Sequence, residues 1–558
     1  MLGSRNKLRF ALSRTNSRVL TKKLKYGNPV VHMNGGQIIL VLPCIKSWGA
    51  TGILLEWEDT FPYSGELANI GSIYIKEGVY TMDEVNRIMQ IAEENGLLVI
   101  QLVQTFGHME FVLKHNEFST LREIQQAPNV ICPLKPESQL LIKAMLEQVL
   151  DAQPNATHLH IGADEVWHYG VCEDCSVHAT GNKHGVVSLY LQHIRDLVLF
   201  IHDKRPNIRI LMWDDMLREY NLGELVEPVV WNYSPVDCFH IPPAMWSSYQ
   251  KVFSHIWVGS AFKGANGCAQ ILVSSSRYVS NQDAWISVAD EKPFDITFEG
   301  VILTGWSRYD HYATLCELLP VAMPSLASCL RRWVKPKQEQ VSEAYNEAVL
   351  SERTCYERFQ KFIKGDFDIE DKDCSGRPKI YEDAELEEDS SQTQKELALT
   401  LEVTQQAVSH HLKSLVMIHK QADIMEVLPQ QDWPGYDMAC AVHAFVLLRN
   451  RCIALIHGDE VAAWLNPWQV ENKYVNPIQV QGIAVAAERL LKELVATEEN
   501  LQSSFQCVIG DRSKNEWIAT LHSPLVKQVR RIYENAYHYA NSAVRALPEC
   551  ICPNANEL

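Results

Sequence analysis

The chain has 558 residues and a mass of 63.5 kDa, with 46% hydrophobic and 21% charged residues. This length and balance indicate a globular protein of two or three domains, and they exclude a collagen, a disordered tail protein and a membrane channel. The net charge of -17 and the pI of about 5.6 argue against a general nucleic-acid binder, because neutralising phosphates requires a basic face.

The N-terminus and the cysteines bear on where the protein resides. Nine Lys or Arg residues and no acidic residue precede Glu56, which fits either a flexible basic extension over residues 1–27 or a mitochondrial transit peptide. Fifteen scattered cysteines favour free thiols in a reducing compartment over a disulfide scaffold. The sequence contains no run of 18 apolar residues, so it predicts no membrane span. We therefore expect a cytoplasmic and nuclear protein, with a transit peptide or a truncated N-terminal anchor left open.

Short apolar runs alternate with amphipathic stretches between residues 28 and 335. Helical patterns separate most of the runs, as at Met82–Asn95, Ser138–Ala152 and Ser188–Lys204. Eight βα units in roughly 300 residues predict an α/β fold of the (β/α)8 TIM-barrel type. The eight runs rich in β-forming residues are 30–33, 53–56, 97–104, 157–161, 208–213, 228–232, 253–257 and 301–306.

Two further regions follow the predicted barrel. Residues 336–395 are expected to form a helix and a solvated linker, because Asp366–Asp389 holds eleven acidic residues against three basic ones. Residues 396–558 are expected to form a helical C-terminal domain, from apolar residues at helical spacing in Val442–Ile456 and Val480–Ala496.

In a barrel of this type, the residues that follow the C-terminal ends of the strands form the active site. Four of these ends carry Trp, and others carry carboxylates, so they predict an apolar cage in which a sugar ring stacks beside acid–base groups. Strand alternation favours Asp215 over Asp214 as the carboxylate that faces the pocket. The strand-end residues are Glu56 and Glu58, Gln104 and His108, Asp164 and Glu165, Trp213 and Asp215, Trp231, Trp257, and Trp306 and Tyr309.

Asp164 and Glu165 are the centre of this prediction. They follow the apolar run 157–161, and the small residues Gly162 and Ala163 allow a turn that brings both carboxylates into one pocket. A Glu walled by Trp and next to another carboxylate has a raised pKa, which suits a general acid at neutral pH. From spacing alone, an exposed pair that caps the next helix is the alternative.

The segment HIGADE (160–165) resembles the His-x-Gly-x-Asp-Glu signature of the β-N-acetylhexosaminidases of glycoside hydrolase family 20. The resemblance covers roughly residues 30–330 and is closest to the hexosaminidase D-like branch. It implies a TIM barrel that removes terminal β-linked N-acetylhexosamine, either GalNAc or GlcNAc, from glycoconjugates without a cofactor. The supporting segments are LLEWEDTFPYSG (54–65), LVQTFGHMEFVLKH (102–115), WDDML (213–217), VVWNYS (229–234), SAFKGA (260–265) and LTGWSRYDHYATLCELLP (303–320).

The resemblance also implies a substrate-assisted retaining mechanism, in which the acetamido carbonyl of the substrate replaces a second carboxylate as nucleophile and forms an oxazolinium ion. Glu165 would then protonate the leaving oxygen and activate water, and Asp164 would hold the acetamido N–H. The residues that we expect to bind the substrate are strand-end residues from the list above and His160 of the signature: Glu56, His108, His160, Trp213, Asp215, Trp231, Trp257, Trp306 and Tyr309.

The chain departs from the family at two places. The family uses a Tyr to hold the acetamido carbonyl, often after the seventh strand, where this chain reads Ile256–Phe262; Tyr309 and Tyr233 both remain open for this role. The link between the first two β runs is also shorter than in the hexosaminidase D-like branch. This leaves open whether the first βα unit is a real variant or a gene-model error.

Other functions remain open beside this one. A non-catalytic glycan-binding protein would keep the pocket without turnover. A metal-dependent barrel hydrolase would use the His-x-His pair His158 and His160 with Asp164 and His168. Cys172 and Cys175, with His178 and His184 nearby, form a lone CxxC, which is a weak signal for a structural zinc.

Our expectation is an enzyme with no catalytic metal ion. Its partner is a glycoconjugate with a terminal β-N-acetylhexosamine and not a nucleic acid, and a homodimer is left open.

Overall fold

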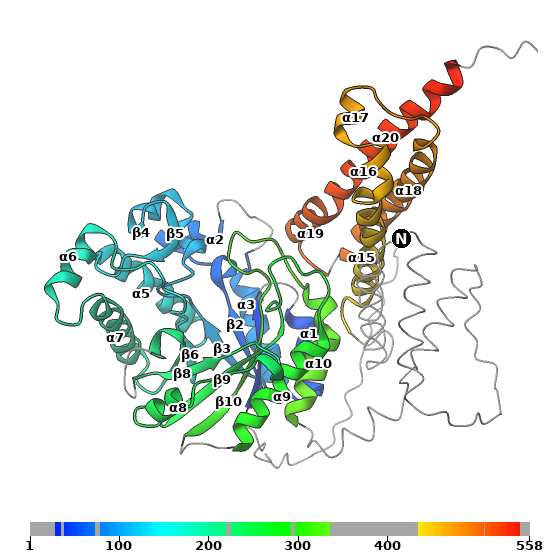
Figure 1. Cartoon of the computed structure of the whole chain (residues 1–558). Coiled ribbons are helices and arrows are strands. Elements are labelled where there is room, and N and C mark those ends of the chain that lie inside the picture. The colour runs from blue at the N-terminus through cyan, green and yellow to red at the C-terminus, as the bar shows by residue number, and fades with distance from the viewer. Residues whose placement is uncertain are drawn as a thin grey trace, which may run out of the picture.

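The computed structural model describes residues 28–34, 38–72, 79–218, 225–291, 296–334, 433–506 and 508–546. The expected basic extension and the segment 336–395 with its acidic stretch lie outside the described residues. The described part forms a barrel and an elongated group of C-terminal helices that leads away from it (Figure 1).

Eight parallel strands close into a barrel in the order β1-β10-β9-β8-β7-β6-β3-β2. The barrel closes at β1, where Val31 pairs with Ile53 of β2 on one side and Leu303 of β10 on the other. The predicted TIM barrel is therefore confirmed. The strands are β1 (Asn28–Asn34), β2 (Gly52–Glu56), β3 (Leu98–Leu102), β6 (His158–His160), β7 (Arg209–Trp213), β8 (Glu227–Trp231), β9 (His255–Lys263) and β10 (Thr297–Gly305).

Helices surround this barrel, and their sequences explain where they begin. At α3, for example, Thr81 accepts the backbone N–H of Glu84, and the Glu84 carboxylate accepts the backbone N–H of Thr81 in return. The helices are α1 (Ile38–Ser47), α2 (Asn69–Ser72), α3 (Met82–Glu94), α4 (Glu110–Leu113), α5 (Pro136–Asp151), α6 (Glu173–Gly181), α7 (Val187–Lys204), α8 (Pro243–Tyr249), α9 (Ser275–Glu291) and α10 (Leu319–Val334). A two-stranded antiparallel sheet of β4 (Arg122–Ile124) and β5 (Ala127–Ile131) lies outside the barrel.

The first βα unit, which the sequence left in doubt, has both its strand and its helix among the described residues. The residues IILVLPCIKS of this segment form α1, whose Val41, Leu42 and Ile45 are buried against the barrel core. Pro43 lies inside this helix. The unit is therefore a short but regular crossover between β1 and β2.

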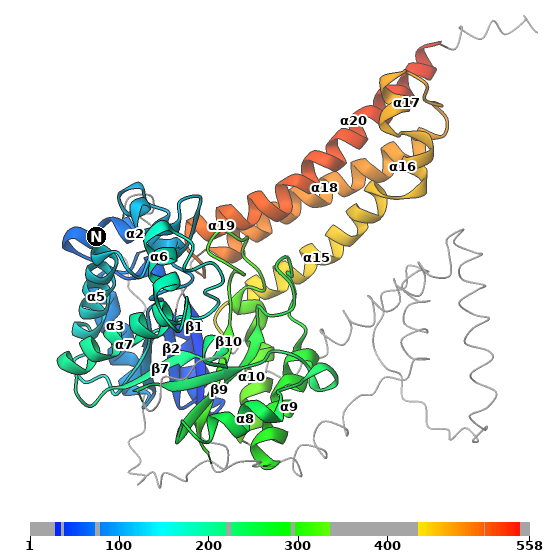
Figure 2. The same cartoon turned by 60° about the vertical axis from the view of Figure 1, so that its left-hand side comes forward.

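The described part of the C-terminal region, residues 433–506 and 508–546, is mostly helical, as predicted from the apolar spacing, whereas residues 396–432 and 547–558 of the predicted domain lie outside the described residues. In both views, α15, α18 and α20 run along one another, α19 lies at the barrel end and α17 at the far end (Figure 2). Helix α10 of the barrel contacts α15. The helices are α15 (Tyr436–Ile456), α16 (Asp459–Trp464), α17 (Pro467–Glu471), α18 (Val480–Phe505), α19 (Asp511–Trp517) and α20 (Ser523–Ala546), with a π-helical turn at Ile518–His522.

One helical stretch in the described residues, Tyr436–Trp464, is long and apolar enough to cross a membrane, with a mean hydropathy of 1.6. The sequence had predicted no such segment. The criterion is met equally by helices that pack inside a protein, and here Val442 and Phe445 are fully buried among the C-terminal helices. The stretch is therefore weak evidence for a span.

Candidate active site

A cavity of about 870 Å³ lies at the C-terminal ends of the barrel strands. Glu56 ends β2, Trp213 ends β7, Trp231 ends β8 and Trp306 follows β10, and all four line this cavity. Because parallel strands place their carboxyl ends on one rim of the barrel, residues far apart in the sequence meet there.

His108, Asp164 and Glu165 form a compact group in the cavity wall. The His108 Nε2 lies 3.6 Å from Oδ2 of Asp164 and 3.3 Å from Oε2 of Glu165. The next helix, α6, begins only at Glu173. The Asp-Glu pair therefore does not cap a helix, and both carboxylates share one imidazole.

An unusual backbone turn brings the two carboxylates together. Gly162, Ala163 and Glu165 all have left-handed φ angles, of 63°, 65° and 49°. A Cβ at Gly162 would lie 2.0 Å from Oε1 of Gln104, the atom that accepts the Ala163 N–H. The Glu165 N–H donates to Oδ2 of Asp215 at 2.8 Å. Left-handed non-glycine residues cost roughly 1–2 kcal/mol each, so these hydrogen bonds hold a strained turn in place.

Burial and charge set the protonation of this group. Burial, with the nearby Asp215, raises the pKa of Asp164 from 3.8 to about 7, although His108 works in the opposite direction. For His108, burial alone would lower the pKa, but the carboxylates of Asp164 and Glu165 outweigh it and raise the pKa to about 10. At neutral pH the wall therefore holds an imidazolium beside a carboxyl group that is close to its midpoint of ionisation.

Asp214 and Asp215 point in different directions. Asp215 accepts the Glu165 N–H and also, through Oδ1, the indole N–H of Trp231 at 3.2 Å. The fully buried carboxylate of Asp214 instead accepts hydrogen bonds from the Arg218 guanidinium and from the backbone N–H of Trp231. Asp215 thus positions both Glu165 and a wall of the cavity.

Aromatic rings form the rest of the wall. The rings of Trp213 and Trp306 lie 5.8 Å apart, and Trp231 stacks on Tyr233 at 5.2 Å with an interplanar angle of 24°. Burial raises the pKa of Tyr233 far above its usual value, so its hydroxyl is neutral and can donate a hydrogen bond. Of the two tyrosines that the sequence left open, Tyr309 is 47% exposed and accepts the Gly267 N–H at the rim. Tyr233 is therefore the better placed of the two.

His160 supports the cavity from below. It ends β6, is fully buried, and its ring lies 4.5 Å from the Trp213 ring. Its Nδ1 accepts the Gly162 N–H at 3.0 Å. His160 thus contacts the strained turn and an aromatic wall without lining the cavity. In the described part of the chain, neither His158 nor His160 belongs to a group of side chains that could hold a metal.

The expectation that Trp257 ends a strand at the pocket is wrong. Strand β9 continues through VGSAFK to Lys263, so Trp257 lies near its beginning, at the opposite end of the barrel. Its indole N–H donates to Glu227, the first residue of β8, at 3.0 Å, and its ring lies 5.9 Å from His158. The predicted run ends at Trp257, but Gly259 and Ser260 still pair with Ile302 and Leu303 of β10, and every residue of β9 after His255 is buried.

Comparison with known proteins identifies the family. A family model described as glycosyl hydrolase family 20, catalytic domain, matches residues 57–252. Hexosaminidase D of Homo sapiens is 31% identical over 506 residues, which cover 89% of this chain and 90% of the human protein. Hexosaminidase D of Bos taurus is 41% identical over 300 residues, covering 52% of this chain and 85% of the bovine protein.

This chain belongs to glycosyl hydrolase family 20. It is accordingly a glycoside hydrolase of the β-N-acetylhexosaminidase type, acting on N-acetylhexosamine. The resemblance inferred from HIGADE and its accompanying segments is confirmed. The matched range holds Asp164, Glu165, His108, Trp213 and Trp231.

Two further similarities to known proteins cover a smaller share of this chain than the human hexosaminidase D does. The Mariner Mos1 transposase of Drosophila mauritiana is 44% identical over 159 residues, which are 27% of this chain and 45% of that protein. This share does not assign the family 20 chain to a second family. The solved β-N-acetylhexosaminidase from Bacteroides fragilis NCTC 9343 covers 60% of this chain and 71% of its own, at 14% identity and a TM-score of 0.42.

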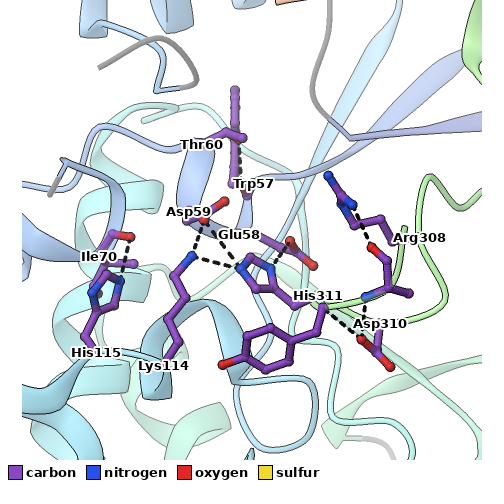
Figure 3. Close-up of polar contacts among 12 residues, drawn as sticks. Trp57, Glu58, Asp59, Thr60, Ile70, Lys114, His115, Arg308, Asp310 and His311 are labelled. Atoms are coloured by element: carbon purple, nitrogen blue, oxygen red, sulfur yellow. Dashed lines mark hydrogen bonds and ion pairs between the residues drawn. The ribbon is translucent and has the colours of Figure 1, made fainter. Parts of the chain in front are cut away.

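A charged network that the sequence did not predict lies on the rim of the family 20 site (Figure 3). Lys114, directly after α4, pairs with the Asp59 carboxylate and lies 2.8 Å from Nε2 of His311. Nδ1 of His311 lies 3.2 Å from Oε2 of Glu58. The network ties the loops that follow β2, β3 and β10 together. No local motif reveals it, because its members lie on three separate loops.

A buried lysine holds the loop that carries Trp306. Burial lowers the pKa of Lys263 to about 8, and its Nζ donates to the Trp306 carbonyl at 2.7 Å. The buried Glu317 accepts the backbone N–H of Gly264 and the hydroxyl of Tyr278. SAFKGA was recognised in the sequence as a family segment, but the contact of its Lys with Trp306 requires the fold.

The C-terminal helices complete one side of the cavity. Gly435, Val508, Ile509 and Arg512 line it from this region. Across the boundary, the Arg308 guanidinium makes two hydrogen bonds to the Glu516 carboxylate, at 2.5 and 2.6 Å. The helical domain thus contributes to the site of the hydrolase.

Proposed function

We propose that this family 20 enzyme removes terminal, β-linked GalNAc or GlcNAc by substrate-assisted catalysis with retention. The observation that supports the proposal is the His108–Asp164–Glu165 group, which places two carboxylates of different environment in one aromatic cavity. Asp164 is buried, whereas the Glu165 side chain is 39% exposed and reaches solvent. Two such environments suit two different roles.

The chemistry follows from these positions. The carbonyl oxygen of the substrate acetamido group forms a bond to C1 while the bond from C1 to the leaving oxygen breaks, and Glu165 donates its proton to that oxygen. Asp164 accepts the acetamido N–H, and the Tyr233 hydroxyl donates to the acetamido carbonyl. Water then attacks C1 and gives its proton to Glu165 while the bond between C1 and the acetamido oxygen breaks, which regenerates the acetamido group, releases the sugar and restores the acid.

The charges around the cavity favour a neutral sugar. Eight acidic side chains line it, against two arginines and the protonated His108. A negative cavity repels sulfated or phosphorylated sugars and so selects against them. The acidic residues are Glu56, Glu58, Asp59, Glu84, Glu110, Asp164, Glu165 and Asp310.

Hydrolysis of p-nitrophenyl β-GalNAc and β-GlcNAc tests the proposal, with the 6-sulfated GlcNAc glycoside as a third substrate. Glu165→Gln is expected to lower kcat by about 10²–10⁴-fold, because general acid catalysis contributes that much, while binding of the sugar persists. No turnover of either neutral glycoside by the folded parent protein would overturn the proposal. The cytoplasmic and nuclear location and the lack of a nucleic-acid partner stay predictions.

A further inference from the structure

Three cysteines and one glutamate converge outside the cavity. Cys132 follows β5, Cys172 precedes α6 and Cys175 lies in its first turn, while Glu123 is in the middle of β4. Cys132 and Cys175 are fully buried and Glu123 is 4% exposed. The sequence offered the CxxC pair with His178 and His184; the fold instead brings Cys132 and Glu123, about 40 and 50 residues earlier in the chain, to the two cysteines.

The distances among these side chains match a tetrahedral metal site. The Sγ of Cys132 lies 3.6 Å from Sγ of Cys172 and 3.5 Å from Sγ of Cys175. The Sγ of Cys175 lies 3.4 Å from Oε2 of Glu123, and all four ligand atoms are within 4.8 Å of one another. A tetrahedral zinc with Zn–S bonds of about 2.3 Å places its sulfurs about 3.8 Å apart and a carboxylate oxygen about 3.6 Å from each sulfur.

The glutamate is oriented as a ligand would be. Its Oε1 accepts the backbone N–H groups of Val171 and Cys172, at 2.6 and 3.0 Å, which leaves Oε2 directed at Cys175. Among the described residues no basic side chain pairs with Glu123. A buried carboxylate without a cation is costly, whereas a metal ion would balance it, and fixed outer hydrogen bonds are typical of metal ligands.

We propose that Glu123, Cys132, Cys172 and Cys175 bind a structural zinc ion. Four protein ligands leave no position open for water or substrate, so the site is structural and not catalytic. It joins the hairpin that follows the His108 loop to the loop that carries Asp164 and Glu165. The zinc would therefore hold the two halves of the catalytic group in register, and it does not depend on the mechanism proposed above.

The first test is the metal content of the full-length protein, purified under reducing conditions after growth with zinc. We expect about one zinc per chain in the parent, and less than a tenth of that in Cys172→Ser and in Glu123→Gln. Cys238→Ala and Cys268→Ala, which change exposed cysteines outside the cluster, should keep the metal. His178→Ala identifies the fourth ligand, because its Nε2 is buried without a hydrogen-bond partner one turn after Cys175. It should also keep zinc if Glu123 is the ligand.

A second measurement guards against variants that fail to fold. The parent, stripped with a chelator and reloaded with Co²⁺, should show the visible absorption of tetrahedral cobalt with thiolate ligands, and Zn²⁺ should displace it and raise the Tm. Three outcomes overturn the proposal: a folded parent that binds no zinc, zinc that survives Cys172→Ser, or a loss of two titratable thiols that shows a disulfide in the cluster.

Discussion

The imidazole of His108 lies 3.3 Å from the carboxylate of Glu165. His108 has a left-handed φ of 52°, a conformation that His, Asn and Asp adopt more readily than most other residues. The same ring nitrogen lies 3.6 Å from Asp164. This one side chain therefore connects the residue proposed as general acid to the residue proposed to hold the substrate amide.

This arrangement predicts a pH dependence of activity. Ionised Asp164 is the form that accepts the acetamido N–H, so kcat/KM should rise with pH through about 7. His108→Asn keeps the backbone conformation but removes the cation that lowers the Asp164 pKa. The acidic limb of the kcat/KM profile should then move to higher pH. His255→Asn, at the opposite end of the barrel, is the control; an acidic limb that stays in place in His108→Asn contradicts the prediction.

The same shifts affect stability. Folding raises the Asp164 pKa from 3.8 to about 7 and the His108 pKa from 6.5 to about 10. Each protonated form stabilises the fold fully below the unfolded pKa, and this contribution is lost as the pH rises through the folded pKa. In the parent, the free energy of unfolding should therefore decrease between pH 6.5 and 10 as His108 loses its proton. The free energy of unfolding of His108→Asn, measured by denaturation, should not show this part of the decrease.

Two tryptophans should respond differently to the same substitution. Trp231→Phe removes an indole N–H from Asp215 at the cavity and should lower kcat/KM roughly tenfold, about 1.4 kcal/mol in the barrier. Trp257→Phe removes one donor from the half-buried Glu227, which keeps Arg209 as its partner, and should cost about 0.5–1.5 kcal/mol of stability with little change in KM. Steady-state kinetics and urea unfolding of both variants check this. An altered KM in folded Trp257→Phe would return Trp257 to the site.

The strained turn makes Gly162 sensitive to a single methyl group. Gly162→Ala places a Cβ 2.0 Å from the Gln104 side chain and forces a left-handed alanine, at a cost of at least about 1–2 kcal/mol. Activity and thermal stability should both fall. Gly482→Ala, in open space within α18, should instead stabilise the protein by about 0.5–1 kcal/mol. Equal effects of the two substitutions would contradict a strained turn at Gly162.

The contact between Arg308 and Glu516 predicts coupling between the helical domain and the cavity. Burial alone would raise the pKa of Glu516, but the Arg308 guanidinium lowers it overall. Glu516→Gln should therefore cost about 1 kcal/mol at neutral pH and raise KM. Because a depressed pKa stabilises the fold only above it, the difference from the parent should vanish as the pH falls through that pKa.

A matched pair inside the helical domain provides the control for this experiment. Glu493 accepts two hydrogen bonds from Arg451 without touching the barrel. Glu493→Gln should lower stability while KM stays at the parent value. A KM that is unchanged in Glu516→Gln as well would show that the helical domain does not shape the site.

The sequence by itself determined the barrel and the family, and it located the Asp164–Glu165 pair that we propose as catalytic. Buried parallel strands carry apolar runs that are visible in single segments, and HIGADE lies in one continuous turn, so local order was enough for both. The prediction from single segments was wrong at Trp257, because the predicted run ends there, whereas strand β9 continues to Lys263.

Only the tertiary structure decided which residues from different loops meet. It brought Cys132 and Glu123 to the CxxC pair, Lys114 to His311, and Glu516 to Arg308. It also stacked Tyr233 on Trp231, whereas Tyr309 lines the cavity from its exposed rim. These contacts depend on how helices and loops close over the rim, and that geometry is set by packing between segments far apart in the chain, not by any pattern within one of them.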